Sequence, residues 1–248
     1  MPRFFVPPFS GEETAVTGED GRHIARSLRM KVGEPLTLCD GLGTDYHCEI
    51  TGFAGDEVFV RVVERAPSRS EPSVKVTVYQ GLPKGDKMDA IVQKAVELGA
   101  WEIVPVLMRR SVSRPDAKAA VKKAARWQKI AEEAAKQSGR GILPQVLAPM
   151  EFSKAAQRAA EAGPVLLFYE GGGEPLKELV YPDSSQLSFF VGPEGGVAEE
   201  EAQLLTEMGA QVATLGPRIL RTETAPLAAL AAVGVVLSNK NLSLTEKK

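Results

Sequence analysis

Hydrophobic and polar positions follow different periods in the two parts of the chain. In the first 65 residues, short runs alternate apolar and polar side chains, as half-buried strands do. We predict strands over residues 35–39, 45–50 and 57–63 and one short helix over 20–30. Residues 66–73 are polar, aperiodic and rich in proline and serine, so we interpret them as a linker. The first part is therefore expected to be a small β-barrel with one helix.

After residue 74 the pattern changes to apolar runs that alternate with amphipathic stretches. Short continuous apolar runs are typical of strands buried on both faces of a parallel sheet. The predicted strands are 74–79, 103–108, 165–169, 187–191 and 211–215, and the predicted helices are 87–98, 116–138, 198–208 and 225–237. We therefore expect an α/β fold class with two domains, a barrel over residues 1–68 and an α/β domain with a mainly parallel sheet over residues 74–248.

The composition is that of an ordinary globular protein, with 44% hydrophobic and 25% charged residues in a chain of 248. The first residues form too short an apolar run for a signal peptide, and no run approaches the roughly 20 apolar residues that span a membrane. Cys39 and Cys48 are the only cysteines, which excludes a disulfide framework and a zinc motif. We expect a soluble, cytoplasmic protein without a metal, in which both cysteines are small core residues.

Charge is distributed unevenly along the chain. The formal net charge of −2 excludes a uniformly basic nucleic-acid binder, but residues 75–140 contain 14 Lys and Arg against 7 Asp and Glu. Any single lysine here is expected to be solvated, whereas the group together favours contact with phosphates. The candidate nucleic-acid-binding residues are Arg109, Arg110, Lys118, Lys122 and Arg126 in this segment, and Arg3, Arg22, Arg26 and Arg29 in the first part of the chain.

Two loops combine features of a ligand site. Residues 192–196 (Gly-Pro-Glu-Gly-Gly) follow a buried strand and precede a helix, at the sheet edge where open α/β sheets bind ligands. Residues 215–226 also join a strand to a helix and contain Arg218 and Arg221. Each loop by itself is a weak signal, because an ordinary strand–helix turn has the same features. Neither the GxxxxGK[ST] nor the GxGxxG nucleotide signature is present in its required context.

Several stretches in one order resemble a known family. They are residues 23–29, 84–89, 93–99, 110–111, 133–140, 192–196 and 220–225. In this order they resemble the SPOUT methyltransferases, and among these the ribosomal RNA small subunit methyltransferase E family. The resemblance implies a PUA-like β-barrel that binds RNA, followed by a SPOUT methyltransferase domain with a deep trefoil knot, which binds the cofactor and dimerises. It also implies a homodimer that transfers a methyl group from S-adenosylmethionine to N3 of one uridine in 16S rRNA, in the decoding region of the small ribosomal subunit.

The resemblance also implies where the cofactor binds. The knot loops are expected to hold S-adenosylmethionine through the segment after residues 165–169 and through the loops at 192–196 and 215–220. The implied cofactor-binding residues are Leu167, Tyr169, Glu170, Gly192, Glu194, Gly195, Gly196, Leu215, Gly216, Ile219, Leu220 and Thr222.

Methylation of uracil N3 requires a proton acceptor and a cation near the carbonyl oxygens on which negative charge develops. Arg221 is the candidate cation, and Glu223 or Glu194 is the candidate proton acceptor. Each glutamate could equally be a helix-entry carboxylate that interacts with backbone N–H groups. The second domain contains no histidine, which argues against histidine as the base. Because N3 lies on the Watson–Crick edge, the base must be unpaired or extruded.

The last predicted helix, residues 225–237, is apolar on all sides, so we expect it to be buried in part against a second subunit. Two other functions remain open. Another SPOUT enzyme that methylates a ribose 2′-oxygen of rRNA or tRNA is one alternative. A non-catalytic RNA-binding protein of ribosome assembly is another, although the glycines in both loops argue against it.

Overall fold

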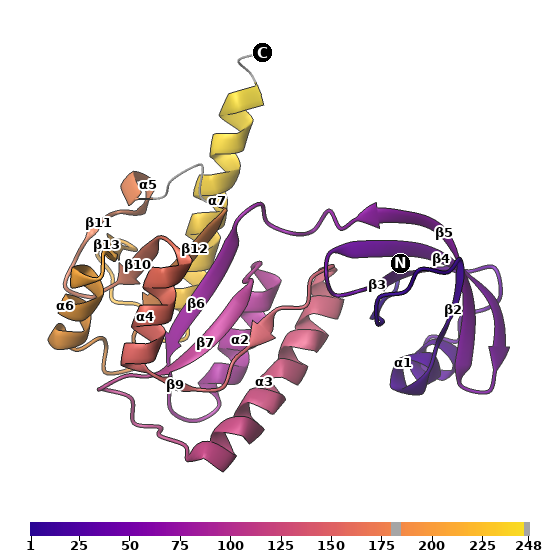
Figure 1. The fold of residues 1–248 in the computed structure, drawn as a ribbon, viewed down its shortest axis with the longest axis horizontal. Helices are drawn as coiled ribbons and strands as arrows, with labels where there is room; N and C mark the ends of the chain where they lie inside the picture. Colours follow the sequence, from indigo (N-terminus) through magenta and orange to yellow (C-terminus); the bar gives the residue numbers. More distant parts are fainter. Residues whose placement is uncertain (180–184, 246–248) are drawn as a thin grey trace. The chain divides into compact units, whose positions relative to one another are not determined.

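The computed structural model describes residues 1–179 and 185–245, which form two compact units (Figure 1). Unit 1 contains residues 1–71 and 135–143, and unit 2 contains the rest of the chain. The sequence predicted domain boundaries at residues 68 and 74. The main division lies between Glu71 and Pro72, and the segment 135–143, which was expected in the second domain, packs within unit 1.

Unit 1 is built on a five-stranded sheet. Its elements are β1 (Arg3–Phe5), β2 (Glu13–Val16), α1 (Gly18–Arg22), the π-helix η1 (His23–Ser27), β3 (Pro35–Cys39), β4 (Thr44–Ala54) and β5 (Glu57–Pro67). The strand order is β1-β3-β4-β5-β2, with β3, β4 and β5 antiparallel to one another. The three predicted strands are present, and β5 extends into the predicted linker. The short strands β1 and β2 were not predicted.

Both cysteines lie in the core of unit 1. Cys39 and Cys48 are free thiols, and burial raises their pKa values to about 12 and about 11. Arg3 and Asp45 lie beside Cys39, with Arg3 Nη1 donating to Cys39 Sγ at 2.8 Å. The prediction that the cysteines are core residues is therefore confirmed, and a thiol held protonated is a poor nucleophile.

Unit 2 is an α/β structure with a parallel sheet. Its elements are β6 (Lys75–Gly81), α2 (Lys87–Glu97), β7 (Glu102–Leu107), α3 (Ala117–Ser138), β8 (Gln145–Val146), β9 (Met150–Glu151), α4 (Phe152–Ala162), β10 (Val165–Phe168), β11 (Glu174–Pro175), α5 (Leu176–Leu179), β12 (Gln186–Val191), α6 (Glu199–Glu207), β13 (Gln211–Thr214) and α7 (Ala225–Thr245). Within the described residues the strand order is β11-β13-β10-β12-β6-β7-β8, with β9 also on β7, and every pair is parallel. The predicted α/β class is confirmed.

Helices cover both faces of this sheet. Leu167, Phe190, Tyr79 and Val104 pair across neighbouring strands, so their side chains share one face. They form a core cluster with residues of α4 and α6. On the other face α7 contacts β6 and α2, and Figure 1 shows α7 behind the sheet with α4 in front of it. Helix α4 was not predicted from the sequence.

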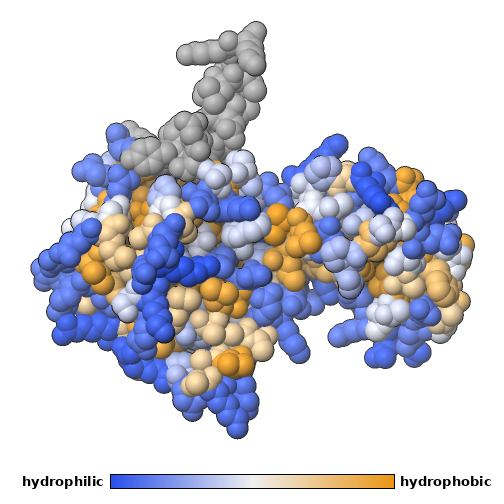
Figure 2. All heavy atoms as spheres, viewed as in Figure 1, coloured by the Kyte–Doolittle hydropathy of each residue, from blue (hydrophilic) through white to orange (hydrophobic). Residues whose placement is uncertain are grey.

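Helix α7 is longer than predicted and is only partly covered. Ala229, Leu230 and Val233 are buried, whereas Ala231 is exposed and Val235 is 61% exposed. An apolar helix with one uncovered side is therefore present in the single chain. None of the helices, over the residues whose structure is described, has the length and apolar character to cross a membrane. Figure 2 shows a visible face that is mostly hydrophilic, with small hydrophobic patches.

Candidate active site

A pocket of about 850 Å³ opens at the carboxyl ends of β10, β12 and β13 in unit 2. This volume is within the range of pockets that hold small-molecule ligands. The predicted cofactor-binding residues that line it are Tyr169, Glu170, Gly192, Glu194, Gly195, Gly196, Leu215, Gly216, Ile219, Leu220 and Thr222. Leu167 does not line the pocket. Successive side chains of a strand face opposite sides, and Leu167 is directed into the core with Phe190.

The loop at residues 192–196 turns tightly because glycine stands at both of its ends. A Cβ on Gly192 would lie 2.7 Å from the backbone carbonyl carbon of Gly196, which leaves no space for a side chain. Gly196 has a φ of +72° and donates its N–H to Pro193 O at 2.9 Å. The sequence therefore specifies a turn that brings backbone to the pocket wall.

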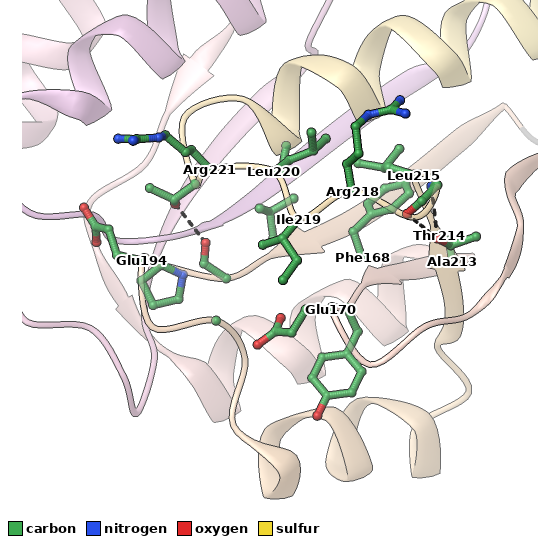
Figure 3. A pocket seen from close by; sticks show the side chains of 18 of the residues that line it. Phe168, Glu170, Glu194, Ala213, Thr214, Leu215, Arg218, Ile219, Leu220 and Arg221 are labelled. Carbon is green, nitrogen blue, oxygen red and sulfur yellow. Dashed lines mark hydrogen bonds between the residues drawn. The ribbon is translucent and has the colours of Figure 1, made fainter.

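A buried glutamine joins the two pocket loops. Gln80, at the end of β6, is fully buried, and its Nε2 donates to Thr222 Oγ1 at 3.0 Å and weakly to Gly192 O at 3.4 Å. The Thr222 hydroxyl in turn donates to Gly192 O at 2.9 Å (Figure 3). The hydroxyl of Thr222, a predicted cofactor ligand, is thus used to hold the loops together. Gln80 was not predicted from the sequence, although a polar residue in a buried apolar strand is a signal of such a role.

Glu170 lines another side of the pocket, and Arg110 lies next to it. Arg110 Nη1 donates to Gly195 O at 2.9 Å and lies 3.8 Å from Glu170 Oε1. Figure 3 shows the Glu170 carboxylate below Ile219, on the opposite side of the pocket from the Arg218–Arg221 loop. Arg110 was predicted to bind RNA. In the structure its side chain contacts the glycine loop of the pocket.

A lysine that was not selected from the sequence joins the two candidate proton acceptors. Lys87 Nζ lies 3.1 Å from Glu194 Oε1 and 3.2 Å from Glu223 Oε2. Partial burial acts to raise the pKa of Glu194, but N–H hydrogen bonds, including that of Lys84, and the Lys87 ammonium hold this pKa below its usual value. A backbone hydrogen bond is the main cause of the lowered pKa of Glu223, and Lys87 adds to it. Both glutamates are therefore ionised at neutral pH.

Two arginines of the second loop extend from the pocket rim in different directions. The side chains of Arg218 and Arg221 are exposed, and no carboxylate of the described residues forms an ion pair with either (Figure 3). Between them, Ile219 is 88% exposed and points into the pocket. Arg221 and Glu194 line the pocket, whereas Glu223 is joined to it through Lys87. The structure thus brings the three candidate catalytic residues to one region.

Comparison with known proteins identifies the family. A family model described as an RNA methyltransferase domain matches residues 70–234, and an RNA methyltransferase PUA domain matches residues 16–63. The ribosomal RNA small subunit methyltransferase E of Bacillus subtilis (strain 168) is 39% identical, over 94% of this chain and 96% of its own length. The enzyme of that name from Mycobacterium tuberculosis is 34% identical, over 96% of this chain and 92% of its own length.

A solved structure agrees with this similarity. The ribosomal RNA small subunit methyltransferase E of Neisseria gonorrhoeae, bound to S-adenosyl methionine, has a TM-score of 0.85 and 34% identity, over 95% of this chain and 98% of its own. The chain belongs to the ribosomal RNA small subunit methyltransferase E family. The family resemblance and the PUA-like first domain are confirmed.

In this member of the methyltransferase E family, most of the candidate RNA-binding arginines already have partners. The ion pairs are Arg3 with Asp45, Arg22 and Arg26 with Asp56, Arg109 with Glu200, and Arg126 with Asp89. By contrast, Arg29, Lys118 and Lys122 are exposed, and no ion pair to a described carboxylate is formed by them. Arg29 in unit 1 and Lys118 and Lys122 on α3 are therefore the residues of this group whose charge is not paired within the described structure.

The described part of this methyltransferase E chain contains no cluster of three His, Cys, Asp or Glu side chains that could hold a metal ion. Near the pocket, charged groups of opposite sign lie together instead: Lys87 with Glu194 and Glu223, and Arg110 with Glu170.

Proposed function

We propose that the chain transfers the methyl group of S-adenosylmethionine to N3 of one uridine in 16S rRNA, in the decoding region of the small ribosomal subunit. The observation that supports this most directly is the pocket that Arg221, Glu194 and the glycine loop share. Its volume suits a ligand of the cofactor's size. Relatives over nearly the whole chain carry the name of this rRNA methyltransferase, and one of them was solved with the cofactor.

The residues of the pocket fit the chemistry of N3 methylation. When bound, S-adenosylmethionine supplies an electrophilic methyl group. The N3–H proton must leave, and Glu194 or Glu223 can accept it because both are carboxylates at neutral pH. The negative charge that develops on the flanking carbonyl oxygens is stabilised by the Arg221 guanidinium, which is unpaired in the described structure and can bond an oxygen and a phosphate together.

We also infer that the active form is a homodimer. The uncovered side of α7, with Ala231 and Val235, is apolar and lies next to buried residues that already hold the helix on the sheet. A second copy placed on this side by a two-fold axis would bury it. The deep trefoil knot, the domain assignment and a cytoplasmic location with ribosomal subunits are further parts of this proposal. Lys118, Lys122 and Arg29 are the proposed phosphate contacts.

The direct test is mass spectrometry of 16S rRNA after incubation of purified small subunits with the protein and S-adenosylmethionine. We expect one added methyl group on a uracil N3, and none when the protein is omitted. A methyl group on a ribose 2′-oxygen would support the alternative SPOUT activity and overturn the proposed chemistry. Absence of both cofactor binding in calorimetry and methyl transfer would support a non-catalytic RNA-binding protein.

A further inference from the structure

Lys87 is placed at the pocket by the start of α2. It is the first residue of this helix, and the next residue, Met88, is buried in the core and anchors the helix end. The lysine side chain is 30% exposed and lies between carboxylates of two loops that are separated by about 30 residues in the sequence. Lys87 therefore connects α2 to two loops of the site, the loop with Glu194 and the loop with Glu223.

We propose that Lys87 is a positioning residue for methyl transfer, which holds Glu194 and Glu223 side by side at the pocket beside Arg221. This inference rests on the proposed function, since it assigns to the glutamates the role of proton acceptor. Lys87 itself acts through the carboxylates and is not proposed to contact the methyl group.

Two observations distinguish this arrangement from an ordinary surface ion pair, which contributes little. First, one ammonium serves two carboxylates, so that two like charges are kept close together. Second, Glu223 Oε2 is buried and receives no hydrogen bond of good geometry from the described residues, and the Lys87 ammonium at 3.2 Å is the ion-pair partner that the described structure gives this oxygen. Glu194 has an additional donor in the N–H of Lys84, at 3.2 Å.

The other charged groups near Lys87 have partners of their own. Asp86 and Asp89, on or next to α2, both pair with Arg126 of α3. Arg221 lies near enough to Glu223 to contribute to lowering the pKa of that carboxyl, after its backbone hydrogen bond and Lys87. The charged groups that face Lys87 are thus Glu194 and Glu223, with Arg221 beyond Glu223.

Removal of the ammonium has a defined consequence. The two carboxylates would face each other without the cation between them, so repulsion would raise the pKa of one of them and push the two loops apart. The carboxylate form would then be lost at a higher pH than in the parent protein. Because a displacement of about 1 Å can cost about 10²-fold in rate, a large fall in kcat is expected without loss of the pocket.

The experiment compares three variants in single-turnover methylation of small subunits between pH 5 and 9. Because the pKa values of both glutamates are held below their usual value, the parent should show no acid limb in this range. We expect Lys87→Met to lower the single-turnover rate constant about 10²-fold and to bring an acid limb into the range, with S-adenosylmethionine affinity close to that of the parent. Lys87→Arg should restore most of the rate and the parental pH profile. The matched control is Lys94→Met, which removes a lysine of the same helix that is paired with Glu97 away from the pocket, and it should leave rate and profile unchanged.

Three results would overturn the proposal: a pH profile of Lys87→Met with no acid limb in the tested range, an equal loss of rate in Lys94→Met, or no recovery of rate in Lys87→Arg. A measurement that does not depend on enzymatic activity distinguishes the Lys87 proposal from the proposed function. Carbon-13 NMR titration of glutamate carboxyls should show Glu194 and Glu223 responding to Lys87→Met and not to Lys94→Met. If this response is absent, the Lys87 proposal fails even when methylation occurs. If the NMR response is present but no uracil N3 is methylated, the positioning of Glu194 and Glu223 by Lys87 is supported and the proposed function is refuted.

Discussion

The replacement Arg221→Ala separates chemistry from folding and from RNA binding. Arg221 is exposed, and no described carboxylate pairs with it, so its removal leaves no buried group without a partner. Surface substitutions of this kind change the free energy of unfolding by about 0.5 kcal/mol or less. The pocket loops keep their links through Gln80 and Thr222, so cofactor affinity should also stay close to that of the parent.

The expected effect is on the methyl-transfer step. A donor that stabilises charge developing in a transition state typically contributes about 10²–10³ in rate, which corresponds to about 2.7–4 kcal/mol. The ground-state uracil carries no such charge, so the same arginine contributes much less to RNA affinity. We therefore expect Arg221→Ala to lower the single-turnover rate at saturating RNA by about 10²–10³ and to lower RNA affinity only slightly.

The matched control is Arg218→Ala, which removes an exposed arginine from the same loop. Its side chain extends in a different direction from that of Arg221 (Figure 3), so the rate should be nearly unchanged. The assay is rapid-quench methylation of small subunits, with RNA affinity measured in parallel. If Arg221→Ala loses only RNA affinity, or if Arg218→Ala loses as much rate, Arg221 does not stabilise the transition state.

Three further predictions concern cofactor, RNA and assembly. Gly195→Trp or Gly216→Trp should block S-adenosylmethionine binding in calorimetry. A Cβ at Gly195 would already lie 3.0 Å from Arg110 Cβ, and Gly216 has a φ of +101° at the pocket rim, so Gly195 lacks the space and Gly216 lacks the backbone geometry for a large side chain. Full affinity in both folded variants would show that other loops bind the cofactor. Neutralising Lys118 and Lys122 should reduce the slope of log RNA affinity against log salt concentration by roughly 0.7–0.9 for each phosphate contact that is lost, with turnover at saturating RNA unchanged. A slope equal to that of the parent would show that α3 is not part of the RNA interface. Val235→Asp should convert a dimer to a monomer in light scattering, because it places a charge on the uncovered side of α7; a parent protein that is monomeric at micromolar concentration would contradict the dimer.

The sequence was most informative where structure is determined locally. Buried parallel strands appear as continuous apolar runs, so β10, β12 and β13 could be placed to within a residue or two. Asp116 was expected to cap the long helix, and its Oδ1 accepts the N–H of Ala119 at 2.7 Å. Helix α4 was missed although Phe152, Ala155 and Ala159 have helical spacing, because alanines give only a weak apolar signal.

Charged residues were harder to assign, because their partners are not local. The excess of positive charge in residues 75–140 was visible in the sequence, but the partner of each arginine depends on tertiary contacts. Asp89 of α2 is a partner of Arg126 of α3 and also accepts the Trp127 Nε1 hydrogen bond at 3.0 Å. Arg126 therefore holds two helices together, whereas Lys118 and Lys122 on the same helix do not have such a carboxylate within the described structure. A helical spacing of cations predicts a face and does not say which charges are already neutralised.

The pocket shows the same division between local and tertiary information. The glycine loop and the arginine loop were found because tight turns and helix starts leave local signals in the sequence. Gln80 and Lys87 were not selected, because each acts on loops more than 100 residues further along the chain. Yet these two residues decide the geometry: Gln80 fixes the spacing of the loops in the interior, and Lys87 fixes it at the surface beside the candidate proton acceptors. The loops supply the reacting groups, and the strand and helix that precede them in the chain supply their arrangement.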